Sequence, residues 1–233
     1  MTESNPWQAI LDIAARYKSW AFIDLETTGL NQPIDVVQLG MERGSVEGGA
    51  WVGATATSVL VEPTVEIDLD AARIHGLYEE QLERGKPTNG AMHGLGELDE
   101  TPMVLIAIPQ VVSWSEAVII AQSTFDAPHP PDAVACWGAY DAEVLAALGE
   151  RGPTLRFDCP VIDLQALYAA TLAPTADGRR RRGTLERAAI RFYCQSPGRR
   201  QSHRALGDAM LARRVWLEMV RDAQHVVDAM AAR

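Results

Sequence analysis

The alternation of apolar and polar residues predicts a β-strand near the amino terminus, in the segment "AFIDLE" at residues 21–26. Side chains two residues apart on a strand point to the same face, so Asp24 and Glu26 share one face and Ile23 and Leu25 share the other. Two like charges at this spacing repel each other. The presence of both acids on one face of the strand therefore calls for a chemical explanation.

Hydrophobic spacing predicts further elements on both sides of this strand. Apolar residues recur at helical spacing from Trp7 to Tyr17, with Asn5 as the cap and Pro6 as the first helical residue. Strands are expected at 36–42 and 57–62, joined as a hairpin through 44–53, and at 132–138. Helices are expected within 68–85, 103–114, 140–152, 161–173, 183–193 and 203–233, with a loop at 90–101.

A strand meander followed by alternating helices and a further strand predicts a mixed α/β domain. The chain has 233 residues with 47% hydrophobic content, enough for one sizeable core. We expect residues 1–18 to form a helical extension packed on a single domain of residues 19–233. The longest apolar stretch, Met103 to Ile108, is too short to span a bilayer, and no signal-peptide pattern precedes it. These features favour a cytoplasmic protein without a membrane partner.

Charge adds one local feature to this picture. The net charge is −10, which argues against a protein that coats nucleic acid through a broad basic surface. Nine arginines nevertheless fall within residues 179–204, four of them in the run Arg179–Arg182. This region is either a solvated loop or a site that holds phosphate groups.

Two further acids stand where a fold can bring them to the first pair. Asp141 follows the expected strand at 132–138, and Asp208 lies early in the last long helix. Clustered carboxylates raise each other's pKa, and a cation that prefers hard oxygen ligands, Mg²⁺ or Mn²⁺, removes that penalty. Two such ions about 3.5–4 Å apart can stabilise the attacking and leaving oxygens of a phosphodiester displacement. Metal binding would therefore explain Asp24 and Glu26.

One histidine is placed to serve the same site. His203 lies five residues before Asp208. At about 100° per residue, five helical steps separate two side chains by roughly 140°, so both reach one site only if His203 precedes the regular helix. We therefore expect a loop histidine. Its ordinary pKa of about 6.5 suits a general base that takes a proton from the attacking water.

Four short stretches, in their order and spacing, resemble the motifs of the DEDDh (DnaQ-like) 3′-5′ exonucleases. They are "FIDLETTG" at 22–29, "IHGL" at 74–77, "WGAYDAEVL" at 137–145 and "HRALGDA" at 203–209. In the order and spacing of these motifs, the resemblance extends over residues 19–220. The combination is specific, whereas each stretch alone would be a weak signal.

The resemblance implies a ribonuclease H-like fold, with a mixed central β-sheet flanked by helices. It also implies stepwise hydrolysis from the 3′ end of single-stranded DNA or RNA by two Mg²⁺ or Mn²⁺ ions, releasing nucleoside 5′-monophosphates. Carried over position by position, it makes Asp24, Glu26, Asp141 and Asp208 the metal-binding acids and His203 the general base. The residues that it implies for substrate binding are Thr27, Thr28, Gly29, Leu30 and His75.

The chain departs from the family pattern in two places. Members often carry His-Asn before the aromatic residue of the "WGAYDAEVL" motif, whereas Trp137 and Gly138 stand there, as in some branches of the family. An amide contact to substrate is then missing. The stretch 86–110 is also longer than the usual link, and a loop there would reshape access for the substrate.

Other interpretations stay open at this point. One alternative is a non-catalytic module of the same fold that binds nucleic acid or a polymerase. Another is a phosphatase of free nucleotides. A pure binder of a polyanion gains nothing from four clustered carboxylates, which favours the exonuclease. A polymerase and a second copy of the chain are both possible partners. His75 contacts substrate or is a structural histidine at a helix end, and Asp163 caps a helix.

Overall fold

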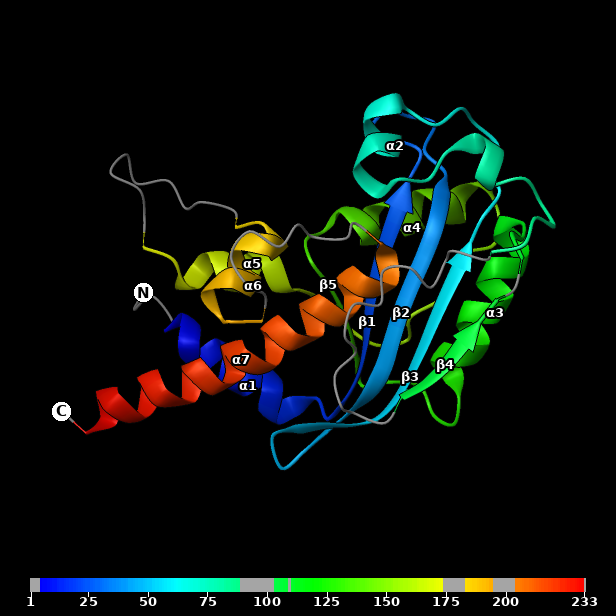
Figure 1. Ribbon diagram of the computed structural model, residues 1–233. Coiled ribbons are helices and arrows are strands. Elements are labelled where there is room, and N and C mark those ends of the chain that lie inside the picture. The colour runs from blue at the N-terminus through cyan, green and yellow to red at the C-terminus, as the bar shows by residue number, and fades with distance from the viewer. Residues whose placement is uncertain (1–4, 89–102, 109, 174–182, 195–203, 233) are drawn as a thin grey trace.

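The computed structural model describes residues 5–88, 103–108, 110–173, 183–194 and 204–232 (Figure 1). The elements are α1 (Pro6–Arg16), β1 (Ser19–Thr27), β2 (Val36–Glu47), β3 (Ala50–Leu60), α2 (Leu69–His75), β4 (Met103–Ala107), α3 (Trp114–Asp126), β5 (Ala133–Cys136), α4 (Tyr140–Arg151), β6 (Val161–Asp163), α5 (Leu164–Thr171), α6 (Leu185–Arg191) and α7 (Ala205–Ala231). A 3₁₀ turn at Glu79–Gln81 follows α2. None of the helices in these ranges has the length and apolar character needed to cross a membrane.

Six strands form one mixed sheet in the order β4-β3-β2-β1-β5-β6. The first three strands are antiparallel neighbours, as the predicted meander requires. Strand β5 pairs with β1 in parallel, β6 pairs with β5 in parallel, and β4 pairs with β3 in parallel. Strand β1 thus lies inside the sheet, between β2 and β5. Its carboxyl end, from Asp24 to Thr27, extends beyond the pairing with β5 and pairs with β2 alone.

The two faces of β1 belong to two separate cores. On one face Ala21, Ile23 and Leu25 pack with α3 and α4. On the other face Trp20 and Phe22 pack with residues of α1, α5, α6 and α7. Asp24 and Glu26 continue the series of Trp20 and Phe22 and so lie on the face that α7 crosses (Figure 1). The predicted sharing of one face by the two acids is confirmed.

The amino-terminal helix α1 packs on the second of these cores. Asn5 caps it, because the Asn5 side chain accepts a hydrogen bond from the backbone N–H of Trp7 at 3.1 Å. Ile10 is fully buried among residues of α7. The Arg191 guanidinium lies 5.9 Å from the centre of the Trp7 ring. The predicted cap and helix are therefore present.

The helix predicted from Met103 to Trp114 is wrong. Residues Met103–Ala107 form the strand β4, paired in parallel with residues 54–58 of β3. The β-branched side chains in this segment suit a strand, and pairing along the free edge of β3 outweighs the weak local helix signal. Helix α3 begins at Trp114, where the prediction had its helix end, because Ser113 and Glu116 form a capping box. The loop predicted at 90–101 falls outside the described residues.

Other elements also differ from the prediction. Residues Val161–Asp163, which were predicted to begin a helix, form the strand β6, because they pair in parallel with β5. Helix α2 ends at His75, because Gly76 adopts a left-handed conformation with φ of +67° and its N–H bonds to the Ala72 carbonyl. Strands β2 and β3 extend until they meet at a tight turn. Gly48 and Gly49 form this turn with φ of +58° and +83°, values that glycine adopts at little cost.

Candidate active site

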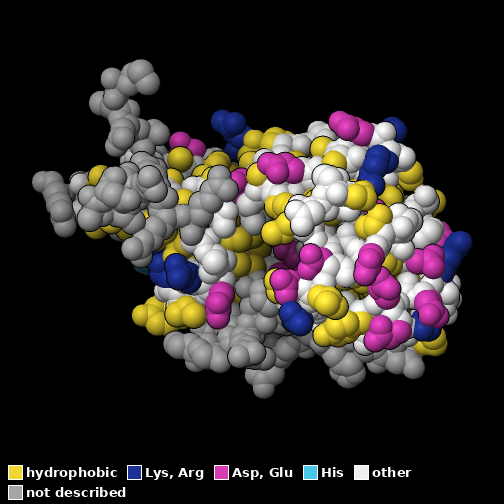
Figure 2. Space-filling model, turned by 90° about the horizontal axis from the view of Figure 1, so that it is seen from above, with side chains coloured by type: hydrophobic (Ala, Val, Ile, Leu, Met, Phe, Trp, Pro, Cys, Tyr) yellow, Lys and Arg dark blue, Asp and Glu magenta, His cyan; other side chains and the backbone are white. Residues whose placement is uncertain are grey.

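Three of the predicted acids meet at the carboxyl end of β1. Asp24 and Glu26 come from β1, and Asp208 comes from the first turn of α7. Each offers a carboxylate oxygen, and these oxygens lie within 4.8 Å of one another. Figure 2 looks down on this end of the sheet and shows acidic side chains in and beside a hollow at its centre. The fold therefore brings the carboxylate of Asp208 to the two carboxylates of β1, which are far from it in the chain.

The close approach of α7 depends on a glycine in β2. Gly40 pairs with Asp24 across the sheet. A Cβ atom at Gly40 would lie 2.0 Å from the backbone nitrogen of Leu206 and 2.1 Å from the carbonyl carbon of Ala205. The first turn of α7 thus rests directly on the β2 backbone. This contact brings Asp208 down to the level of Asp24.

The side chain of another β2 residue, Gln38, caps the first turn of α7. Gln38 pairs with Glu26 across the sheet and is buried. Its Oε1 accepts a hydrogen bond from the backbone N–H of Ala205 at 3.3 Å, and its Nε2 donates to Ser58 Oγ at 3.0 Å. The Arg204 side chain, at the N-cap position, makes no capping bond. Sequence reasoning missed both Gln38 and Gly40, since neither carries a local signal for a helix start.

An ion pair inside the protein holds the next turns of α7 on the sheet. Arg213 Nε donates to Glu42 Oε2 at 2.9 Å, and Trp51 Nε1 donates to Glu42 Oε1 at 3.0 Å. All three side chains are buried. Burial raises the pKa of Glu42, and the Arg213 charge opposes that rise. Breaking one partner of such a pair is costly, so α7 is firmly fixed.

The fourth acid, Asp141, reaches the cluster from the other face. It lies in the first turn of α4 and is buried. Its carboxylate accepts a hydrogen bond from the backbone N–H of Leu25, the residue between Asp24 and Glu26. The negative charge of Asp141 raises the pKa of both β1 acids. All four predicted acids are thus electrostatic neighbours.

Burial and the charges of neighbouring acids raise the pKa of Asp24, Glu26 and Asp141. The pKa of Asp24 is raised well above its ordinary value, first by burial and then by Asp141, Asp208 and Glu26. Burial and the charges of Asp208 and Asp141 raise the pKa of Glu26 to about 8. Burial also raises the pKa of Asp141 to about 7, although its bond from Leu25 opposes the rise. Arg204 lowers the pKa of Glu26 but leaves it high.

The donor set fits a divalent cation of the hard type. Carboxylate oxygens are the ligands that Mg²⁺ and Mn²⁺ prefer, and three of them already lie within 4.8 Å. The raised pKa values show that the cluster resists holding its full negative charge alone. A bound cation would reverse this by favouring the ionised form of every acid. Asp24, Glu26 and Asp208, with Asp141 beside them, are the residues able to hold it.

The metal-free protein is expected to become less stable as pH rises from about 5 to about 8. Glu26 and Asp141 have pKa values of about 8 and about 7 in the folded protein, against ordinary values of 4.5 and 3.8. Between these limits the folded state binds more protons than the unfolded state, so a rising pH favours unfolding. Thermal unfolding measured across this range in the presence of a chelator checks the prediction. Each kcal/mol of lost stability lowers Tm by about 2–4 °C.

The variant Glu26→Gln provides the control, because it removes the group with the higher pKa of the two. Its Tm should fall less steeply over the same range. Excess Mg²⁺ should flatten the wild-type profile, since a cation binds the ionised acids. A wild-type Tm that stays level or rises with pH, without metal, would contradict the electrostatic account.

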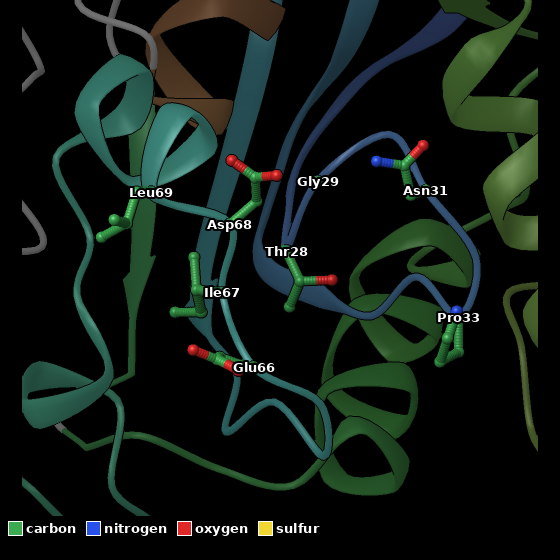
Figure 3. A pocket seen from close by; sticks show the side chains of 8 residues that line it. All are labelled: Thr28, Gly29, Asn31, Pro33, Glu66, Ile67, Asp68 and Leu69. Carbon is green, nitrogen blue, oxygen red and sulfur yellow. The ribbon is translucent and has the colours of Figure 1, made fainter.

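A pocket of about 450 Å³ borders the loop that follows β1 (Figure 3). The residues that line it are Thr28, Gly29, Asn31, Pro33, Glu66, Ile67, Asp68 and Leu69. Two of the five residues predicted to bind substrate, Thr28 and Gly29, thus face a cavity. Thr27 is buried beside them and Leu30 is exposed. Thr28, which lines this pocket, follows Glu26 by two residues in the chain.

The remaining predicted residues have different outcomes. His75 is the last residue of α2 and is buried, with 3% of its surface exposed, and its Nδ1 accepts a hydrogen bond from the Leu77 N–H at 3.0 Å. It therefore helps to shape the turn after α2, and its contact with substrate stays a prediction. Asp163 caps α5, as predicted, by accepting from the Ala166 N–H at 2.9 Å. His203 and the run Arg179–Arg182 lie outside the described residues.

No protein-family model and no curated protein sequence matches this chain. Solved structures do match it. A full-length 3′-exonuclease matches with a TM-score of 0.55 at 13% sequence identity, over 88% of this chain and 83% of that protein. The nuclease domain of 3′hExo, a DEDDh family member bound to rAMP, matches with a TM-score of 0.57 at 13% identity, over 88% of this chain and 93% of that domain.

A longer nuclease has the same fold in part of its chain. Exonuclease I of E. coli, in complex with a dT13 oligonucleotide, matches with a TM-score of 0.59 at 15% identity. The match covers 91% of this chain and 43% of exonuclease I, so the chain spans less than half the length of that enzyme. The predicted mixed sheet flanked by helices, the ribonuclease H-like fold of the DEDDh exonucleases, is confirmed.

Proposed function

We propose that this chain, which has the fold of the DEDDh 3′-5′ exonucleases, is itself a metal-dependent 3′-5′ exonuclease. One observation carries the proposal. Asp24, Glu26 and Asp208, from two elements far apart in the chain, place carboxylate oxygens within 4.8 Å of one another at the position where Asp141 joins them. Such a cluster is unfavourable for folding, so it is best explained by a function that needs it.

The four acids would hold two Mg²⁺ or Mn²⁺ ions. When bound, these ions neutralise charge on the scissile phosphate and make an attacking water more acidic. The acids would hold the ions in a fixed orientation, because β1, α4 and α7 fix the backbones of these four residues. His203, which lies just before α7 along the chain, would accept the proton of the attacking water.

The pocket at the loop that follows β1 would take the terminal nucleoside. Thr28 and Gly29 form part of its wall, and the backbone of this turn can approach a ligand closely. The solved structures support a single-stranded substrate, since exonuclease I is bound to oligonucleotides and the 3′hExo domain to rAMP. The net charge of −10 is consistent with the binding of a chain end in a cleft, not with coverage of a long polymer.

The test is mass analysis of products from matched DNA and RNA oligonucleotides labelled at the 5′ end, incubated with Mg²⁺ or Mn²⁺. We expect the labelled strand to shorten one nucleotide at a time and nucleoside 5′-monophosphates to accumulate. A chelator should stop the reaction, and excess metal should restore it. The same experiment compares the two sugars, because an enzyme that reads the 2′-hydroxyl distinguishes RNA from DNA.

Two substrates serve as controls. A nucleoside monophosphate should release no inorganic phosphate, and a phosphatase would instead release it from this substrate. A circular oligonucleotide should survive, since it has no 3′ end. Cleavage of the circle, or the absence of any metal-dependent cleavage of the linear strands, would refute the proposal.

A further inference from the structure

A phenol hydroxyl connects the helix that carries Asp141 to the loop that lines the pocket. Tyr140 is the first residue of α4 and directly precedes Asp141. Its Oη donates a hydrogen bond to the Gly29 carbonyl at 2.9 Å and lies 3.1 Å from Thr27 Oγ1. Thr27 Oγ1 also donates to the Gly29 carbonyl, at 3.1 Å. Since a carbonyl oxygen has two lone pairs, it can accept both hydroxyl hydrogens.

The loop needs such a constraint at Gly29. The φ angle of this residue is +156°, outside the range that residues with a side chain usually adopt. Glycine has more freedom than other residues, so the backbone alone defines the direction of its carbonyl weakly. Both hydroxyl groups donate to this carbonyl. Tyr140 supplies its bond from a rigid helix, 111 residues away along the chain.

The preceding residue, Thr28, is constrained by a separate set of bonds. The Thr28 N–H donates to the Asp35 carbonyl at 2.9 Å, and its carbonyl accepts from the Asp68 N–H at 2.7 Å. Thr28 Oγ1 accepts from the Asp35 N–H at 3.0 Å. Thr28 is therefore bonded to the backbone at Asp35 and at Asp68, whereas the Gly29 carbonyl is held by the hydroxyl groups of Thr27 and Tyr140. Figure 3 shows Thr28, Gly29 and Asp68 around the same cavity.

We propose that Tyr140 is a positioning residue, whose hydroxyl fixes the Gly29 side of the pocket in the geometry that binds the terminal nucleoside. The inference rests on the proposed exonuclease function and adds a residue that acts on nucleoside binding through Gly29. Because the bond ends on the loop and not on an acid, its loss should weaken substrate binding and leave the metal site intact. A ring without the hydroxyl would keep the packing of Tyr140 and lose the bond.

The variant Tyr140→Phe tests this with the smallest possible change. Loss of one neutral hydrogen bond should raise KM for a single-stranded oligonucleotide about fivefold, with kcat unchanged within about twofold. The Kd of the released nucleoside 5′-monophosphate, measured by calorimetry with Mg²⁺ present, should rise by the same factor. The Kd of Mn²⁺ should stay at the wild-type value. Tyr193→Phe is the matched control, since Tyr193 is 94% exposed, and should equal wild type in all four quantities.

A second variant separates the hydroxyl from the ring. If Tyr140→Phe equals wild type while Tyr140→Leu loses affinity for the mononucleotide, the ring acts alone and the inference is wrong. A fall in kcat accompanied by a weaker Kd for Mn²⁺ would also overturn it, because Tyr140 would then act through Asp141. Failure of the proposed function looks different, since the wild-type protein itself would cleave no oligonucleotide. The mononucleotide Kd still decides on Tyr140 in that case, and wild-type protein that binds no mononucleotide would overturn the inference too.

Discussion

Replacing Asp24 with asparagine is expected to lower nuclease activity by at least about 10³-fold and, at the same time, to stabilise the metal-free protein. The amide has nearly the same shape as the carboxylate but carries no charge, so it is a poor ligand for Mg²⁺. The substitution also removes a buried group that Asp141, Asp208 and Glu26 repel in its charged form. Oligonucleotide cleavage and the unfolding midpoint in a chelator, both measured at pH 8, check the two effects.

The opposite signs of these effects make the prediction sharp. A residue that only supports the fold would lose stability and activity together when it is replaced. Asp228→Asn is the control for the chemical change, because Asp228 is an exposed residue near the end of α7. It should leave both quantities unchanged. An Asp24→Asn variant that keeps metal-dependent activity would exclude Asp24 as a metal ligand.

His203→Ala gives a useful contrast within the same assay. A general base contributes about 10²–10⁴-fold to the rate, so turnover should fall by that factor. The variant should still bind Mn²⁺ as wild type does, because the proposed ligands are the four acids. Loss of metal affinity in this variant would instead make His203 a ligand.

Replacing Gly40 with alanine should destabilise the protein by about 1–3 kcal/mol and reduce activity by about 10²-fold. The new Cβ would lie 2.0 Å from the Leu206 nitrogen, closer than any two such atoms approach, so the first turn of α7 must move away from β2. Asp208 sits in that turn and moves with it. A misplacement of about 1 Å is enough to cost such a factor in rate. Denaturant unfolding and oligonucleotide cleavage at saturating Mg²⁺ measure the two effects.

Gly152→Ala is the matched control for this substitution. A Cβ atom at Gly152 meets nothing within 4 Å, and the extended backbone there suits any residue. This variant should keep wild-type activity and stability within about 0.5 kcal/mol. A Gly40→Ala variant with wild-type stability would show that α7 does not need the close contact with β2.

Local pattern predicted many of the elements, because their signals lie within a few residues. The period of two in β1 placed Asp24 and Glu26 on one face, and Asn5 with Pro6 marked the start of α1. The prediction failed at Met103–Ala107, where an apolar run is compatible with helix and strand alike. Pairing with β3 decided the outcome there. Such pairing depends on a neighbour that the local sequence does not contain.

The residues of the candidate site also fall into two groups, those that the sequence pattern identified and those that it did not. The four acids were identified from the sequence, since their spacing in the motifs and the cost of unpaired carboxylates point to metal binding. The roles of Gln38, Gly40 and Tyr140 were not, although Tyr140 stands inside a recognised motif next to Asp141. Each acts through a partner that is distant along the chain: the Gln38 bond to Ala205 spans 167 residues and the Tyr140 bond to Gly29 spans 111.

The sequence by itself therefore determined which acids are the candidates for metal binding and on which face of β1 two of them lie, because residue type and strand period are local properties. Only the tertiary structure decided how closely the acids meet and which uncharged residues hold them. The distances between the acids depend on the contact of α7 with the β2 backbone at Gly40, and the shape of the loop after β1 depends on the hydrogen bond from Tyr140 of α4. Contacts of this kind arise only when the whole chain has folded, since no short segment contains both partners.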